Sequence, residues 1–282
     1  MATYKEIRGS QIEAVATDPS NPIEGQVWYN TTSNVLKGQA VTVAGAWSSV
    51  NNLNTARYAG GGAGITTAAL YASGTSPPGD APQTETFNGT NWTEVNDVNN
   101  NRNGLENQGV GTQSAAMIFG GYDDAGNAVV DTEQWNGTNW TEVNDLNTGR
   151  YNIGSSNAAP STSMIVFGGG PPNTGATEQW NGTNWTETND MNTARNALSG
   201  AGVYASALGF GGNPSGSVVG LTEEWNGSSW TEVADMSVAS VYRGATGLSS
   251  SALAMGRSAS PFNGVELWTG AGAAQTRTFT DS

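Results

Sequence analysis

Short apolar runs separated by glycine-rich segments recur along most of the chain. Residues 115–119, 164–167 and 207–210 are such runs, and each ends at a Gly-Gly pair. A run of four or five apolar residues matches a buried strand and is too short for a helix. The pattern therefore predicts strands joined by tight turns.

A second pattern follows each of these runs. Asn-Gly dipeptides at 136–137, 181–182 and 226–227 each lie between two tryptophans that are five residues apart. Asn-Gly flanked by strand-forming residues is typical of a β-hairpin. Each Gly-Gly run is thus expected to be followed by two antiparallel strands.

The strands belong to a repeat of about 45 residues, marked by a tryptophan and an arginine in register. The tryptophan opens the fourth strand of each complete unit, at Trp92, Trp140, Trp185 and Trp230, and a degenerate copy places Trp47 45 residues before Trp92. The arginines are Arg57, Arg102, Arg150, Arg195 and Arg243. This period is that of one four-stranded propeller blade, and it predicts five blades.

These features resemble the kelch family of β-propellers across about residues 41–270. The shared features are the Gly-Gly after the second strand, the Trp that opens the fourth strand, and an aromatic residue that ends the third, at Phe87, Trp135, Trp180, Trp225 and Trp268. The hairpin between the third and fourth strands is shorter than the usual kelch hairpin. The repeated sequence Glu-Gln-Trp-Asn-Gly-Thr-Asn-Trp-Thr-Glu also resembles the repeats of kelch-like proteins from tailed phages that infect marine bacteria and cyanobacteria. The resemblance implies an all-β, five-bladed kelch-like propeller in a virion protein.

The two ends of the repeat are complementary. Residues 46–53 match only the fourth strand of a unit, whereas residues 243–270 contain the first three strands and no fourth. Pairing them would close the ring and hide both sheet edges. Residues 276–280 alternate like a strand and compete for the same place. We expect a propeller over residues 41–282 that is closed by the strand at 46–53.

Residues 1–40 lie outside the repeat and form a separate expected segment. Two short strands, 26–29 and 35–37, are predicted on either side of a polar turn. The segment is similar to a motif near the start of phage tail-fibre and other virion proteins. Large aromatic residues are enriched in interface hot spots, so Trp28 and Tyr29 are the candidate docking residues toward other virion proteins. A short N-terminal β-hairpin extension with a docking role is the expectation.

Composition narrows the functional classes. The chain has 282 residues, 10 basic and 24 acidic, and a net charge of −14, which disfavours nucleic acid and anionic membrane surfaces as partners. It contains no His and no Cys, so Ser–His–Asp triads, thiolate nucleophiles and His- or Cys-ligated metals are excluded. A copper site like that of galactose-oxidase-like propellers is excluded for the same reason. Neither a signal peptide nor a membrane-spanning segment is recognised.

The repeated residues are expected to serve the architecture. The tryptophans are expected to pack between neighbouring sheets and not to form a carbohydrate-stacking surface. Five arginines in register suggest either an anion-binding ring or structural pairing. We expect them to cap backbone carbonyls or to pair with the repeated carboxylates Glu94, Glu142, Glu187 and Glu232.

Repeated acidic and Asn-X-Thr positions receive the same interpretation. Asp97, Asp145, Asp190 and Asp235 suggest calcium, but each stands without neighbouring acidic ligands, so turn capping is expected. The Asn-Gly-Thr and Asn-Trp-Thr triplets match glycosylation sequons. We interpret this match as a coincidence, because the same residue types are favoured in tight turns. No metal and no cofactor are expected.

The sequence leads to a virion structural protein on the particle exterior, present in multiple copies. We expect it to be tail- or fibre-associated, and to bind a host-surface glycan or protein through the variable loops that follow the Gly-Gly strands. The receptor-facing candidates are Pro77, Asp80, Tyr122, Asp123, Asp124, Asn173 and Asn213. One alternative is a capsid-decorating head fibre or knob without a receptor role. A glycan-degrading enzyme is disfavoured because the non-repeated acids form no evident catalytic pair.

Overall fold

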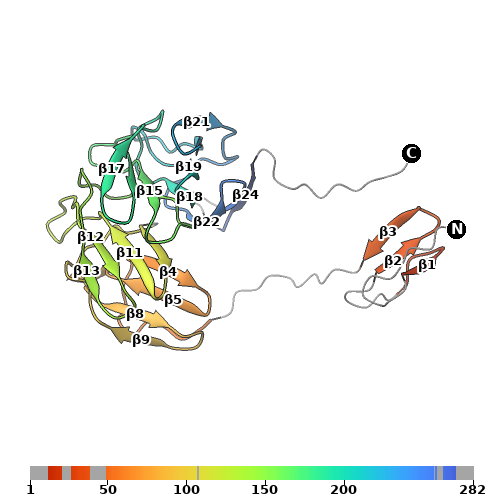
Figure 1. Cartoon of the computed structure of the whole chain (residues 1–282), viewed down its shortest axis with the longest axis horizontal. Helices are drawn as coiled ribbons and strands as arrows, with labels where there is room; N and C mark the ends of the chain where they lie inside the picture. Colours follow the sequence, from red (N-terminus) through yellow and green to blue (C-terminus); the bar gives the residue numbers. More distant parts are fainter. Residues whose placement is uncertain are drawn as a thin grey trace. The chain divides into compact units, whose positions relative to one another are not determined.

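The computed structural model shows a chain that divides into two compact parts (Figure 1). One contains residues 1–49 and 274–282, and the other contains residues 50–273. The structure describes residues 12–20, 27–38, 49–106, 108–256, 258 and 263–270. Residue 40, at which the sequence places the boundary, lies outside this range.

The N-terminal part contains one small three-stranded sheet. Its strands are β1 (Glu13–Val15), β2 (Val27–Asn30) and β3 (Val35–Gly38), in that order. β2 and β3 form the expected antiparallel hairpin, whereas β1 adds a parallel strand that the sequence did not reveal. Trp28 is buried, and its Nε1–H donates to Asp18 Oδ1 at 3.0 Å.

The repeat part consists of consecutive antiparallel sheets, which makes the fold all-β and β-propeller-like. Four sheets have four strands each, paired in chain order. These are β4 (Gly61–Ile65), β5 (Ala68–Ala72), β8 (Thr84–Phe87) and β9 (Trp92–Val95); β10 (Gly109–Thr112), β11 (Ala115–Phe119), β12 (Thr132–Trp135) and β13 (Trp140–Glu142); β14 (Gly154–Ser155), β15 (Met164–Phe167), β16 (Thr177–Trp180) and β17 (Trp185–Thr188); and β18 (Ser199–Val203), β19 (Ser206–Phe210), β20 (Thr222–Trp225) and β21 (Trp230–Val233). We number the repeat units one to four by these sheets. Within the described ranges the chain contains no helix, and thus none long and apolar enough to cross a membrane.

The fifth unit has three strands, β22 (Gly244–Leu248), β23 (Ser251–Met255) and β24 (Val265–Thr269). The expected closing strand lies partly outside the described residues, at 46–48, and residues 49–53 are described without strand structure. The competing segment at 276–280 also lies outside the described residues. The remaining pair, β6 (Thr75–Ser76) and β7 (Gly79–Asp80), forms a small ribbon in the first unit.

The Asn-Gly hairpins have four-residue loops. In the second unit Trp135 and Trp140 lie directly opposite each other across β12 and β13. The Asn136 side chain accepts hydrogen bonds from the backbone N–H groups of Thr138 and Asn139, and Gly137 has a φ of 92°. Asparagine therefore holds the turn while glycine supplies the left-handed backbone.

Tryptophans join neighbouring units. The Trp140, Trp185 and Trp230 side chains are buried, and each donates its Nε1–H to a threonine hydroxyl of the preceding unit: Thr84, Thr132 and Thr177, at 2.8, 3.1 and 2.9 Å. Trp92, in the first unit, is half-buried. The buried indoles therefore combine a large apolar area with one satisfied polar atom.

The Gly-Gly pairs allow the next unit to approach closely. Gly120 has a φ of 60°, and a Cβ atom there would lie 2.5 Å from the carbonyl oxygen of Arg150. The N–H of Gly121 donates to that same carbonyl at 3.1 Å. A side chain at position 120 would push the arginine segment of the third unit away.

Candidate functional site

The repeated arginines form buried ion pairs. In each of the five units the partner is the glutamate at the second position of the third strand. Only the pair of the fifth unit differs in its exposure. The pairs are Arg57–Glu85 at 2.5 Å, Arg102–Glu133, Arg150–Glu178 and Arg195–Glu223 at 2.7 Å, and Arg243–Glu266 at 2.9 Å. The first four glutamate side chains are at most 2% exposed, and Glu266 is 17% exposed.

The partners expected from the sequence were wrong. Glu94, Glu142, Glu187 and Glu232 are all exposed. Glu94 lies directly opposite Glu85, but on the fourth strand, which forms the outer edge of the sheet. The expected capping of carbonyls does occur, since Arg57 also donates to the carbonyls of Thr55, Tyr71 and Ser73.

Each buried glutamate accepts several hydrogen bonds. Glu85 accepts from Arg57, from the backbone N–H groups of Asn54 and Thr55, and from the Asn54 side chain. Burial acts to raise the pKa of Glu85, but these hydrogen bonds outweigh it and hold the pKa below its ordinary value. Because the guanidinium groups are enclosed and paired with carboxylates, the arginines serve the architecture of the units and offer no anion-binding ring.

Two of the repeated aspartates bind backbone. Asp145 Oδ1 accepts from the N–H of Thr132 at 3.2 Å, and Asp235 Oδ1 accepts from the N–H of Thr222 at 3.1 Å. Each therefore ties the segment after the fourth strand to the start of the third. Within the described part of the chain, no group of three or more acidic side chains is placed to hold a metal ion.

The candidate loop residues form two separate clusters. In the first, the Asp80 N–H donates to Asp124 Oδ1 at 2.7 Å, and Asn103 Nδ2 donates to Asp80 Oδ1 at 2.5 Å. Burial raises the pKa of Asp80, and the nearby carboxylate of Asp124 adds to the effect. Asp123 holds its own turn by accepting from the N–H groups of Ala125 and Asn127.

In the second cluster, Asn173 Nδ2 donates to the carbonyls of Asn213 and Pro214, at 2.7 and 2.9 Å. Pro77 is exposed in the turn between β6 and β7. The loops of the first and second units therefore contact each other, as do those of the third and fourth.

A hollow of about 470 Å³ lies beside these loops, and we call it the tyrosine pocket. It is lined by Gly104, Glu106, Tyr122, Gly126, Tyr151, Asn152 and Tyr242. Its position follows from the repeat, because the residue after the arginine pairs with the residue after Gly-Gly in the same unit, as Asn103 does with Tyr122. The pocket therefore combines residues of the second, third and fifth units.

The geometry of the pocket suits a polyhydroxylated ligand. The Tyr122 and Tyr151 rings are 4.8 Å apart, and Asn152 Nδ2 donates to the Tyr242 hydroxyl at 3.3 Å. Burial, and then the Glu106 carboxylate, raise the pKa of both Tyr122 and Tyr242, so both phenols are neutral donors near neutral pH. Glu106 Oε2 is buried without a hydrogen-bonding partner among the described residues.

Sequence reasoning found only Tyr122 of these pocket residues. Tyr151 directly follows a repeated arginine, and Tyr242 directly precedes one. A search for aromatic residues next to the repeated arginines would have found both. Glu106 lies in an insertion before β10 and has no repeated counterpart.

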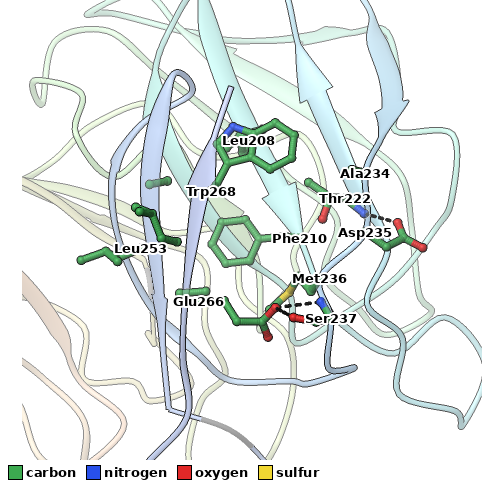
Figure 2. A pocket seen from close by; sticks show the side chains of 13 residues that line it. Leu208, Phe210, Thr222, Ala234, Asp235, Met236, Ser237, Leu253, Glu266 and Trp268 are labelled. Carbon is green, nitrogen blue, oxygen red and sulfur yellow. Dashed lines mark hydrogen bonds between the residues drawn. The ribbon is translucent and has the colours of Figure 1, made fainter. Parts of the chain in front are cut away.

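A second pocket, of about 230 Å³, lies between the fourth and fifth units (Figure 2). Figure 2 shows the Phe210 and Trp268 rings at its centre, with Met236 and the Thr222 hydroxyl beside them. Its lining comprises Leu208, Phe210, Thr222, Ala234, Asp235, Met236, Ser237, Ala252, Leu253, Ala254, Glu266, Leu267 and Trp268. This largely apolar lining contrasts with the hydroxyl-rich tyrosine pocket.

Comparison with models of known protein families gives no match. Comparison with curated proteins gives none either.

Proposed function

We propose that this chain is a non-catalytic binding protein on the exterior of a tailed-phage particle, associated with its tail or fibres. In this proposal the repeat part is a five-bladed propeller, and the tyrosine pocket binds a host-surface glycan. The observation that carries the proposal is the gathering of Tyr122, Tyr151 and Tyr242 around Glu106 and Asn152. Concave sites with aromatic walls and a few placed polar groups are typical ligand sites.

The polar groups of the pocket favour a neutral sugar or an amino sugar. Tyrosine faces provide apolar surface for the C–H face of a sugar ring, while their hydroxyls and Asn152 provide hydrogen bonds. The Glu106 carboxylate, which lines the pocket, would accept a hydroxyl or ammonium hydrogen. An anionic sugar would be repelled by Glu106 and by the net charge of −14.

The scaffold supports such a role because its framework and its loops are separate. Buried Arg–Glu pairs and inter-unit Trp–Thr hydrogen bonds recur in the units, whereas the loops after Gly-Gly differ in length and sequence. Binding residues are commonly carried on such variable loops over a rigid scaffold.

The N-terminal part would dock the chain to other virion proteins, in multiple copies per particle. Trp28 is buried within its own sheet, so the residues available for docking are its half-buried neighbour Tyr29 and the exposed apolar side chains Val27 and Leu36. A capsid-decorating protein without a receptor role is the alternative. Labelling the chain on purified particles separates the two, because tail location supports attachment and capsid location supports decoration.

Binding of the purified full chain to a panel of host-surface glycans tests the proposal. We expect Tyr151→Ala and Tyr242→Ala each to weaken binding at least about tenfold, since aromatic truncations at hot spots cost this much or more. Tyr29→Ala, in the other part of the chain, is the matched control and should bind normally. Binding that is unaffected by both pocket variants, or absent from every host glycan, would overturn the proposal.

A further inference from the structure

Glu106 is an acidic side chain of the tyrosine pocket that has no cationic partner. None of the ion pairs formed by the described residues includes it, and its Oε2 atom has no hydrogen-bond donor among them. The cationic side chains in the described residues of the repeat part are the five repeated arginines. Each arginine is paired with its own glutamate. Within the described residues, the repeat part therefore supplies no cation to Glu106.

Other carboxylates make the surroundings of the pocket acidic. After burial, the Glu106 carboxylate is the next cause of the raised pKa of Tyr122 and Tyr242, and Asp80 adds to the shift at Tyr122. Asp80 lies in the adjoining loop cluster, where its N–H donates to the Asp124 carboxylate. Because these carboxylates attract positive charge, the pocket favours a ligand with a cationic group.

The aromatic walls supply a second attraction for a cation. The Tyr122 and Tyr151 ring centroids are 4.8 Å apart, and the ring planes are inclined at 58°, so the two rings form a corner. The Tyr242 hydroxyl accepts from Asn152, the residue after Tyr151. A cation within about 6 Å of a tyrosine ring centroid is attracted by the negative face of the ring. Three tyrosines beside one carboxylate are thus suited to an ammonium group.

Backbone hydrogen bonds hold these walls in place. The backbones of Tyr151 and Gly170 exchange two hydrogen bonds, at 2.9 and 3.2 Å. The N–H of Tyr242 donates to the Ala197 carbonyl at 3.1 Å, and the N–H of Ala197 donates to the Asn152 carbonyl at 3.0 Å. This series of contacts connects the fifth unit to the third through the fourth. Side chains that are positioned before binding lose less freedom when a ligand arrives.

The pocket is larger than a simple ammonium ion requires. Its volume of about 470 Å³ falls within the range of about 300–1,000 Å³ that is typical of small-molecule sites. Asn152 and the tyrosine hydroxyls add neutral hydrogen-bonding groups, which suit the hydroxyls of a sugar. A ligand that uses all of these groups carries hydroxyls and one ammonium group on the same ring.

We propose that the tyrosine pocket selects sugars with a free, protonated amino group, and that Glu106 sets this preference. The inference rests on the proposed function, because it names the class of glycan that the pocket binds. The ammonium group lies between the Glu106 carboxylate and the Tyr122 and Tyr151 rings, and the sugar hydroxyls meet Asn152 and the tyrosine hydroxyls. Acetylation of the amine removes its charge and with it the preference.

Titration of the purified full chain with glucosamine and with glucose, at about pH 6, tests the preference. The two sugars differ at one position, where glucosamine carries an ammonium group at this pH. We expect glucosamine to bind at least about tenfold more tightly, and to shift the ring NMR signals of Tyr122, Tyr151 and Tyr242. Glucosamine binding that is absent, or no tighter than glucose binding, would overturn the inference. Binding of host-surface glycans would then decide the proposed function separately.

The variant Glu106→Gln keeps the shape of the side chain and removes its charge. We expect it to weaken glucosamine binding about tenfold and to leave glucose binding within about twofold, so the glucose titration also shows that the pocket is folded. Tyr151→Ala should weaken binding of both sugars. Glu187→Gln removes the same charge from an exposed position on β17 and, as the matched control, should change neither. Unaltered glucosamine binding in Glu106→Gln, or equal weakening for both sugars, would overturn the role of Glu106.

Discussion

The Arg243 guanidinium lies 2.9 Å from the Glu266 carboxylate, although it reaches that position from a different place on the backbone than the other arginines. The N–H of Gly169 donates to the carbonyl of Arg195, whereas the N–H of Gly212 donates to the carbonyl of Ser240. Ser240 therefore occupies the backbone position of an arginine, and Arg243 supplies the guanidinium from three residues later. The ion pair therefore forms in the fifth unit too, although its arginine lies three residues later in its unit than the arginines of the other units.

We expect Arg150→Ala to destabilise the repeat part by about 3–5 kcal/mol, because it leaves the buried Glu178 carboxylate without its cation. Urea or thermal unfolding measures the change. Ser215→Ala is the control, since Ser215 is an exposed loop residue, and should stay within about 0.5 kcal/mol. Asn173 is unsuitable as a neutral control because it donates two hydrogen bonds to a neighbouring loop. Equal stability of the two variants would contradict a structural role for the ion pair.

Gly120→Ala should destabilise the chain more than Gly126→Ala. Both glycines have positive φ, so both variants carry about 1–2 kcal/mol of backbone strain. Only at position 120 does the added Cβ meet a backbone oxygen, at 2.5 Å, while at position 126 nothing lies within 4 Å. Comparing the urea midpoints of the two variants isolates the destabilisation that the close approach between units adds to the backbone strain. Similar midpoints would mean that this approach adds nothing beyond backbone strain.

The N-terminal part should lose stability in acid through Asp18. Hydrogen bonds from Lys37, Trp28 and Asn30 lower the pKa of Asp18 from 3.8 to about 2. A lowered folded-state pKa gives a stabilisation that is complete above about pH 4 and is lost as the pH falls toward 2. The NMR signal of the Trp28 indole N–H follows this loss. Asp18→Asn should remove this pH dependence, and an unaltered profile would refute the assignment.

Docking through the N-terminal part should depend on its exposed residues. We expect Tyr29→Ala combined with Leu36→Ala to reduce incorporation of the chain into particles several-fold, with normal melting of the repeat part. Leu248→Ala, at a similarly exposed leucine in the repeat part, is the control. Normal incorporation of the double variant would argue against docking through this sheet. Trp28→Ala is a poor test, because that side chain is buried in its own sheet.

The sequence was sufficient for the features that depend on neighbouring residues. Short apolar runs predicted the second strands of three units, at β11, β15 and β19, and Asn-Gly predicted the hairpins, because strand propensity and turn geometry are local properties. It also identified β2 and β3. It missed β1, a three-residue strand whose parallel pairing with β2 depends on a contact distant in sequence.

Tertiary structure alone decided which repeated residues meet. Glu85 and Glu94 recur with the same period, so periodicity could not choose between them as the partner of Arg57. The choice follows from burial, because Glu85 lies on an inner strand and Glu94 on the sheet edge. The tyrosine pocket is another such case: Tyr122, Tyr151 and Tyr242 occupy different positions in their repeats, and only the packing of separate units brings them together.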